Sequence, residues 1–328
     1  MKSNRVLLAL ICCSLALGNV ALASVPAQWV KTRSVEADVK NADGTTTRQI
    51  TQAPIDLDND KKPDVVAVGN LQDIAFNERG ELIGWYDKLF KGTDFKGDYN
   101  NKSNLLQAGL PGAVVTLTDT VGAVKAAAPI TSLDPKTEIL TAQFSYTRGD
   151  ARVQKKYTIH PRKLLVTLEL NVSGVKSYTL EWRLLAVGAT KPLELGSVPD
   201  AQYAALQCCN NFLGAPGQAF VVKPQAGSKF GATIETKAVQ RSTDQQTIEV
   251  SRMLLTLPSG VSKLDVYGGD NELVRLNQEG FYSLPGLFDP NIFGQLSLAV
   301  VRLLEWLHGF VGNWGLTIIL LTVLVRIA

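Results

Sequence analysis

The chain has 328 residues, 45% of them hydrophobic, and carries a formal net charge of +3 from 33 basic and 30 acidic side chains. This hydrophobic content is enough for one large core or two ordinary ones and argues against a disordered chain. The nearly balanced charge provides no strong field to attract a phosphate backbone, so we expect no nucleic-acid partner.

Residues 1–23 have the composition of an export segment. A basic start is followed by an uncharged apolar run, and small residues at Ala21 and Ala23 fit the cleavage site of a signal peptide. The run from 6 to 23 is close to the roughly 20 residues that cross a bilayer, so an uncleaved first transmembrane helix is the alternative. Gly18 interrupts the run and favours cleavage. Either interpretation exports the residues that follow.

Residues 24–62 are polar and include a run of threonines, so we expect a linker with few regular elements. Aspartates near its end have the 1, 3, 5, 9 spacing of a calcium loop: Asp56, Asp58, Asp60 and Asp64. Lys61 replaces the usual glycine of such a loop, and Ala67 replaces its bidentate glutamate. These departures favour a solvated acidic turn and leave calcium as the alternative.

Residues 63–285 show the alternation of strands that have one buried face. The clearest apolar positions are Leu140, Ala142, Phe144 and Tyr146, and similar runs at 164–172 and 178–184 are separated by turn residues at 171–174. Further strands are expected at 64–69, 72–77, 81–86, 113–118, 153–159, 218–223, 231–239, 246–257 and 263–267. A dozen short strands without amphipathic helices between them predict one large antiparallel β-sandwich.

Few side chains in this domain are suited to catalysis. The chain has two histidines: His160 precedes a proline at a strand end, and His308 belongs to a C-terminal helix. The adjacent pair Cys208 and Cys209 can close only a strained ring. The sequence contains no nucleophile motif, phosphate loop or zinc spacing, so we expect no enzyme activity and no cofactor. An exported sugar-binding or lectin-like domain tethered to the membrane is the alternative function.

Residues 286–312 predict an amphipathic helix, because the polar residues between 295 and 310 fall on one narrow line. Its apolar side includes Leu303, Trp306, Leu307 and Phe310. Such a helix either packs on its own domain or lies in the membrane interface. The next segment favours the interface, where Trp306 and Trp314 would lie at headgroup depth.

Residues 313–328 predict the start of a transmembrane helix that continues beyond Ala328, because 15 residues remain from Trp314 onward and a span needs about 20. Thr322 and Arg326 are four residues apart and share one helix face. An arginine within a bilayer is costly unless it faces water or a partner, which predicts a polar intramembrane groove. The alternative is that Arg326 flanks the inner end of a short span.

The segment from Trp306 to Gly315 and the residues that follow it closely resemble the start of the conserved core of YidC-type membrane protein insertases. In that family an Asn-Trp-Gly motif, an isoleucine-rich stretch, a threonine and an arginine mark the helix after the large periplasmic domain. The corresponding residues are Asn313, Trp314, Gly315, Thr322 and Arg326. Residues 76–86 and 264–269 are similar to the opening hairpin and the last strand of the family's first periplasmic domain.

The resemblance implies a galactose-mutarotase-like supersandwich on the periplasmic or extracellular side of the bacterial inner membrane. It implies an insertase and chaperone that inserts, folds and assembles integral membrane proteins, alone or with the Sec translocon, through a hydrophilic groove. In that groove Arg326 would attract polar or acidic parts of the incoming chain. The implied partners are nascent membrane proteins, the Sec translocon and its accessory subunits, the ribosome and membrane lipids.

Overall fold

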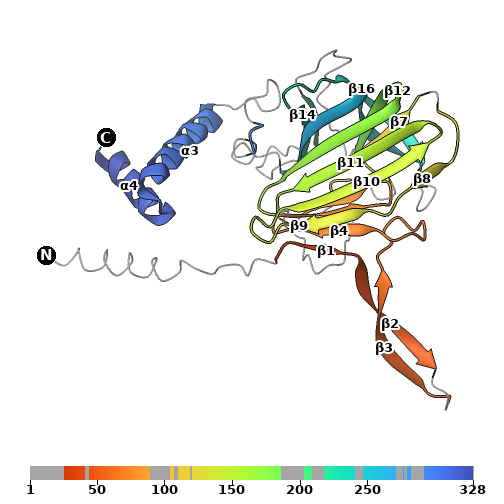
Figure 1. The fold of residues 1–328 in the computed structure, drawn as a ribbon. Helices are drawn as coiled ribbons and strands as arrows, with labels where there is room; N and C mark the ends of the chain where they lie inside the picture. The colour runs from red at the N-terminus through yellow and green to blue at the C-terminus, as the bar shows by residue number, and fades with distance from the viewer. Residues whose placement is uncertain are drawn as a thin grey trace.

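The structure, a computed structural model, is mainly antiparallel β-sheet followed by two helices (Figure 1). It describes residues 26–40, 44–88, 104–106, 110–118, 120–185, 203–208, 218–240, 247–270, 276, 279–281 and 292–327. The predicted export segment, residues 1–23, lies outside the described residues, as does Cys209.

Two sheets make up the main β-rich part. The smaller sheet has the order β1-β4-β5-β6, formed by β1 (Gln28–Val30), β4 (Val65–Val68), β5 (Gln72–Phe76) and β6 (Leu82–Asp87). The larger sheet has the order β13-β14-β16-β12-β11-β10-β8, and β15, β7 and β9 pair with β16, β12 and β10. Its strands are β7 (Val114–Leu117), β8 (Val124–Ala126), β9 (Ile130–Leu133), β10 (Leu140–Arg148), β11 (Ala151–Ile159), β12 (Leu165–Leu185), β13 (Ala204–Cys208), β14 (Gln218–Pro224), β15 (Gly231–Gln240) and β16 (Thr247–Asp270).

A single large apolar cluster joins the two sheets face to face. The Phe76 ring of the smaller sheet lies 4.7 Å from the Tyr157 ring and 5.3 Å from the Phe144 ring of the larger one. Trp85 on β6 meets Phe220 on β14 edge to face at 5.4 Å. All five side chains are buried, and buried aromatic pairs stabilise a core beyond the area they remove from water. The predicted antiparallel β-sandwich is therefore confirmed.

The alternation read from the sequence is visible in β10. Leu140, Ala142, Phe144 and Tyr146 are buried, as the period of two predicts, and β10 pairs with β11 along its whole length. The turn predicted at 171–174 is wrong, because β12 runs unbroken from Leu165 to Leu185 beside β16. Likewise, the two strands predicted at 246–257 and 263–267 are parts of the single strand β16.

A β-bulge replaces the predicted turn. The pairing of β12 with β16 shifts register between Val172 and Ser177, and Gly174 has a φ of +82°. A Cβ at Gly174 would lie 2.5 Å from the backbone oxygen of Asp150, so the position requires glycine on both counts. The glycine that suggested a turn therefore allows one strand to bend without ending.

The polar segment 24–62 was expected to lack regular elements, and this prediction is wrong. β1 pairs with β4 in the smaller sheet, so the sandwich begins before residue 63. β2 (Thr32–Lys40) and β3 (Thr46–Pro54) form a two-stranded ribbon that projects from the sandwich (Figure 1). Threonine and valine favour strands even when both faces are wet, and Gly44, with a φ of +84°, supports the connection.

Candidate functional site

The C-terminal helices form a hairpin beside the sandwich, as Figure 1 shows. α3 spans Ile292–Val311 and α4 spans Trp314–Ile327, and the two helices pack against each other. The structure thus places a helix within the predicted range 286–312 and a second one within 313–328. Among the described residues, no helix combines the length and the apolar character that crossing a bilayer requires.

The corner between the helices is built from the Gly-Asn-Trp sequence. Gly312 adopts a left-handed φ of +66° and donates its N–H to the His308 carbonyl at 2.8 Å, which ends α3. The Asn313 side-chain oxygen accepts the Leu316 N–H at 3.2 Å and caps α4. The His308 ring stacks on Trp314 with centroids 3.9 Å apart. The motif therefore fixes a tight turn between two apolar helices.

α3 carries an exposed apolar surface. Trp306 is 60% exposed and Phe310 is 74% exposed, and their rings contact each other at 4.9 Å. Leu303 is also exposed, as is Trp314 at the start of α4. Leu307 differs from this predicted set, because it is only 5% exposed and is the one buried side chain among those described in α3. These exposed side chains together form an apolar surface on the helix pair, and the interfacial role of this surface stays a prediction.

The two predicted groove residues lie in the C-terminal half of α4. Both Thr322 and Arg326 are exposed. The Thr322 hydroxyl donates to the Ile318 carbonyl at 2.8 Å, so it is satisfied within its own helix. The surrounding exposed side chains of α4 are apolar, including Ile319 and Val323. A groove role for Thr322 and Arg326 stays a prediction.

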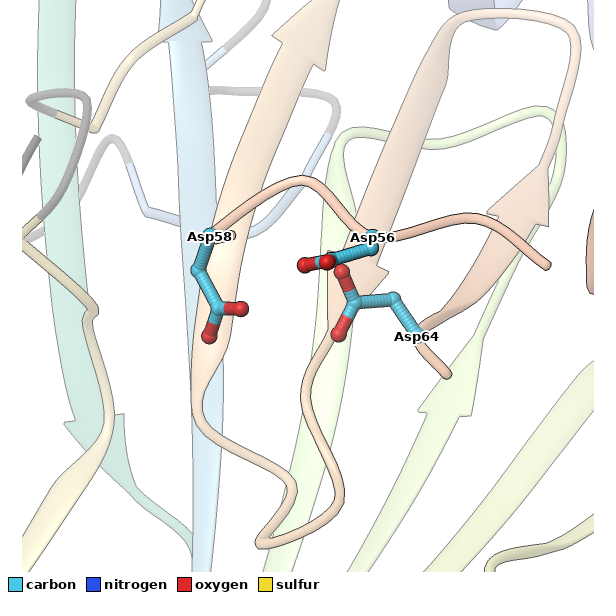
Figure 2. A group of neighbouring side chains, drawn as sticks. All are labelled: Asp56, Asp58 and Asp64. Carbon is cyan, nitrogen blue, oxygen red and sulfur yellow. The ribbon is translucent and has the colours of Figure 1, made fainter. Parts of the chain in front are cut away.

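The acidic loop between β3 and β4 brings three of its four predicted aspartates together. One carboxylate oxygen each from Asp56, Asp58 and Asp64 lies within 4.8 Å of the others (Figure 2). Asp60 is not in this group, because its carboxylate pairs with the Lys62 ammonium at 3.0 Å. Lys61 takes a φ of +67°, the left-handed conformation that the missing glycine usually supplies.

Burial dominates the electrostatics of this loop. Burial raises the pKa of Asp64 to about 7, with the backbone N–H of Leu57 opposing the shift and the charges of Asp58 and Asp56 adding to it. The pKa of Asp58 is also raised, first by burial and then by the negative charge of Asp60. The negative charges of the loop carboxylates therefore make it harder for their neighbours to ionise.

One buried cation was missed by the sequence analysis. Lys155 lies inside the sandwich, where its ammonium donates to the carbonyls of Ala113 at 2.7 Å and Gly80 at 3.2 Å. Its position was visible in the pattern, since it falls in phase with the buried residues Val153 and Tyr157. His160 is half-buried at the end of β11, and burial lowers its pKa. Cys208 ends β13.

Comparison with known proteins identifies a relative. The membrane protein insertase YidC of Deinococcus radiodurans is 37% identical over 205 residues, which are 57% of this chain and 44% of that protein. The chain therefore spans less than half the length of the curated relative that it matches. No protein-family model matches the chain.

The comparison with solved structures finds partial likenesses to enzymes that are distant in sequence. A heparan sulfate lyase HepC mutant from Pedobacter heparinus has 9% identity and a TM-score of 0.36, covering 64% of this chain and 34% of the lyase. The GH36 alpha-galactosidase AgaA A355E from Geobacillus stearothermophilus has 12% identity and a TM-score of 0.38, covering 66% of this chain and 42% of the galactosidase. Neither likeness bears on the chemistry of this chain.

Proposed function

We propose, from the 37% identity to the membrane protein insertase YidC of Deinococcus radiodurans, that the chain is part of a protein that inserts membrane proteins into the bacterial inner membrane. The protein acts without enzymatic chemistry, as an insertase and chaperone for nascent membrane proteins. The 37% identity carries this proposal. The exposed apolar helix hairpin supports it, because such a surface suits a lipid environment.

In this account, each part of the chain has a different task. The β-sandwich occupies the periplasmic or extracellular side, and α3 lies in the membrane interface with Trp306 and Trp314 at headgroup depth. α4 enters the bilayer from that interface. The Sec translocon with its accessory subunits, the ribosome and lipids are the partners we propose for the insertase.

Arg326 provides the positive charge that receives polar or acidic segments of a substrate within the bilayer. An unpaired guanidinium at that depth is costly, so it requires water or an anionic partner, and a hydrophilic groove supplies both. Thr322 is one helical turn away and extends the polar face. Arg326 could act through its charge alone or through bidentate hydrogen bonds. A lysine at this position separates the two roles, because it keeps the charge but cannot form the bidentate hydrogen bonds of arginine.

The role of Arg326 can be tested by complementation in cells whose growth depends on the whole protein. Arg326→Ala should abolish growth and the insertion of membrane proteins, while Arg326→Lys should retain much activity if charge alone suffices. The matched control is Arg48→Ala, which removes an exposed arginine from the β2–β3 ribbon and should leave insertion unchanged. If Arg326→Ala inserts a panel of acidic-tailed substrates normally at wild-type protein levels, Arg326 is a topology flank and the groove role is wrong.

A further inference from the structure

The acidic loop occupies a defined place between the ribbon and the sandwich. It runs from the end of β3 at Pro54 to the start of β4 at Val65. Its ends are held together, because the Asp64 N–H donates to the Ile55 carbonyl at 2.8 Å and the Ile55 N–H donates to the Lys31 carbonyl at 3.1 Å. The loop therefore sits where both ribbon strands join the sandwich.

Two carboxylates in this loop each use one oxygen to fix the loop and leave the other without a partner. Asp64 Oδ2 accepts the Leu57 N–H at 2.6 Å, and Asp56 Oδ2 accepts the Lys61 N–H at 3.1 Å. Asp64 Oδ1 and Asp56 Oδ1 are buried and have no hydrogen-bond partner within the described part of the chain. A buried carboxylate oxygen without a donor is costly, so these atoms call for a ligand.

Asp64 has the greatest need for a ligand, because it is the most deeply buried of the three aspartates. Its side chain is 1% exposed, so water cannot freely solvate the unpartnered oxygen. The carboxylates of Asp56 and Asp58 converge on it within 4.8 Å (Figure 2). Three carboxylates at this separation repel one another unless a positive charge lies between them.

The basic side chain nearest in sequence does not supply that charge. The Lys62 ammonium pairs with Asp60 at 3.0 Å and with Glu78 at 2.7 Å. Among the ion pairs that described residues form with one another, none involves Asp56, Asp58 or Asp64. No side chain in the described part of the chain therefore balances the group, which leaves the place between the carboxylates open to a cation from solution.

We infer that Asp56, Asp58 and Asp64 bind one Ca²⁺ ion at the junction between the ribbon and the sandwich. The ligand atoms are all carboxylate oxygens, which suit hard cations and not Zn²⁺ sites built from sulfur and nitrogen. Oxygens that share one Ca²⁺ at 2.3 to 2.6 Å are at most about 5 Å apart, which the observed group satisfies. An irregular loop favours Ca²⁺ over Mg²⁺, which demands a near-ideal octahedron.

The ion would hold the base of the ribbon. Asp56 and Asp58 follow β3, whereas Asp64 directly precedes β4 of the smaller sheet. A single ion that ligates both sides ties the ribbon strand to the sandwich. Binding therefore restrains the loop and protects it from cleavage.

Isothermal titration of the full 328-residue chain in detergent, after chelator treatment, tests the site. CaCl₂ should bind with a stoichiometry of one and a dissociation constant on the order of 10⁻⁴ M, typical of extracellular modules. Asp64→Asn and Asp58→Asn should each weaken Ca²⁺ binding at least tenfold. Asp134→Asn is the matched control, because Asp134 also accepts hydrogen bonds from its own loop and should leave binding unchanged.

A second measurement keeps the test decisive if a variant folds poorly. Limited proteolysis of the unmodified chain should cut between residues 55 and 64 more slowly in CaCl₂ than in chelator. Absence of both a saturable Ca²⁺ isotherm and this protection would overturn the site. Tighter binding of MgCl₂ than of CaCl₂ would overturn the assignment to calcium. Ca²⁺ binding that survives both Asp64→Asn and Asp58→Asn would place the ion elsewhere.

Discussion

Lys155 lies in the interior of the sandwich, where its charge makes the stability of the fold depend on pH. Burial lowers its pKa from 10.5 to about 8, although the negative charge of Glu81 opposes the shift. The ammonium donates hydrogen bonds to two backbone carbonyls, those of Gly80 and Ala113. A polar group in the core thus connects the β5–β6 turn to the larger sheet.

The lowered pKa predicts a pH dependence with a definite sign. Between about 8 and 10.5 the unfolded chain binds more protons at Lys155 than the folded one, so this residue's contribution to folding stability rises with pH. Relative to Lys155→Met, the wild type should gain roughly 2 kcal/mol in free energy of unfolding from pH 7 to pH 9.5. Urea denaturation at several pH values measures this difference, and a difference independent of pH would contradict the burial of the charge.

Single residues also show where sequence analysis succeeds and where it stops. The sequence favoured a solvated acidic turn and kept four aspartates as ligands in the calcium alternative, but the structure gathers three of them, and Asp60 pairs with Lys62 instead. Leu307 belongs to the apolar side of its helix by periodicity, yet it is buried where its neighbours Trp306 and Phe310 are exposed. Periodicity specifies which residues are apolar but not which part of that surface another helix covers.

At the scale of elements, α3 keeps an exposed apolar surface that includes Leu303, Trp306 and Phe310, although Leu307 is buried. Replacing Leu303 and Phe310 by glutamate should weaken liposome binding of a chain ending at Val311 at least tenfold, because each substitution removes about 1.5 to 3 kcal/mol of apolar burial. Leu307 is unsuited to this test, since it is already buried. Flotation of the protein with anionic liposomes measures the binding.

The matched control for that experiment adds the same two charges elsewhere. Thr46→Glu with Gln49→Glu places them on the exposed β3 strand, where they should leave liposome binding unchanged. Equal binding by the α3 double variant and the wild type would show that α3 packs against protein and not lipid.

The elements differ in how well the sequence specifies them. Strands with one buried face, such as β10, follow from alternation alone. The β2–β3 ribbon escaped prediction because both of its faces are largely polar, which leaves no apolar phase to detect. The continuity of β12 escaped it because a glycine with positive φ serves a bulge as well as a turn. Which of the two forms depends on the neighbouring strand, and local sequence does not specify that neighbour.

At the scale of the whole molecule, a large sandwich precedes a helix pair whose exposed side chains are mostly apolar. The sandwich class was predictable, because alternating strands without helices between them have few other ways to bury their faces. The strand order was not, since it depends on pairings between distant segments, such as β12 with β16. The insertase proposal rests on homology over 205 residues together with this division into a β-rich part and an apolar hairpin.

Site-specific photocrosslinking in the whole protein tests this proposal most directly. A photoreactive amino acid at position 326 should crosslink to a stalled nascent membrane protein, whereas the same group at Thr46 on the ribbon should not. The crosslink should depend on the ribosome-bound chain and disappear after its release. Absence of a crosslink from position 326, with functional protein and a substrate known to insert, would contradict the account that this segment receives nascent membrane proteins.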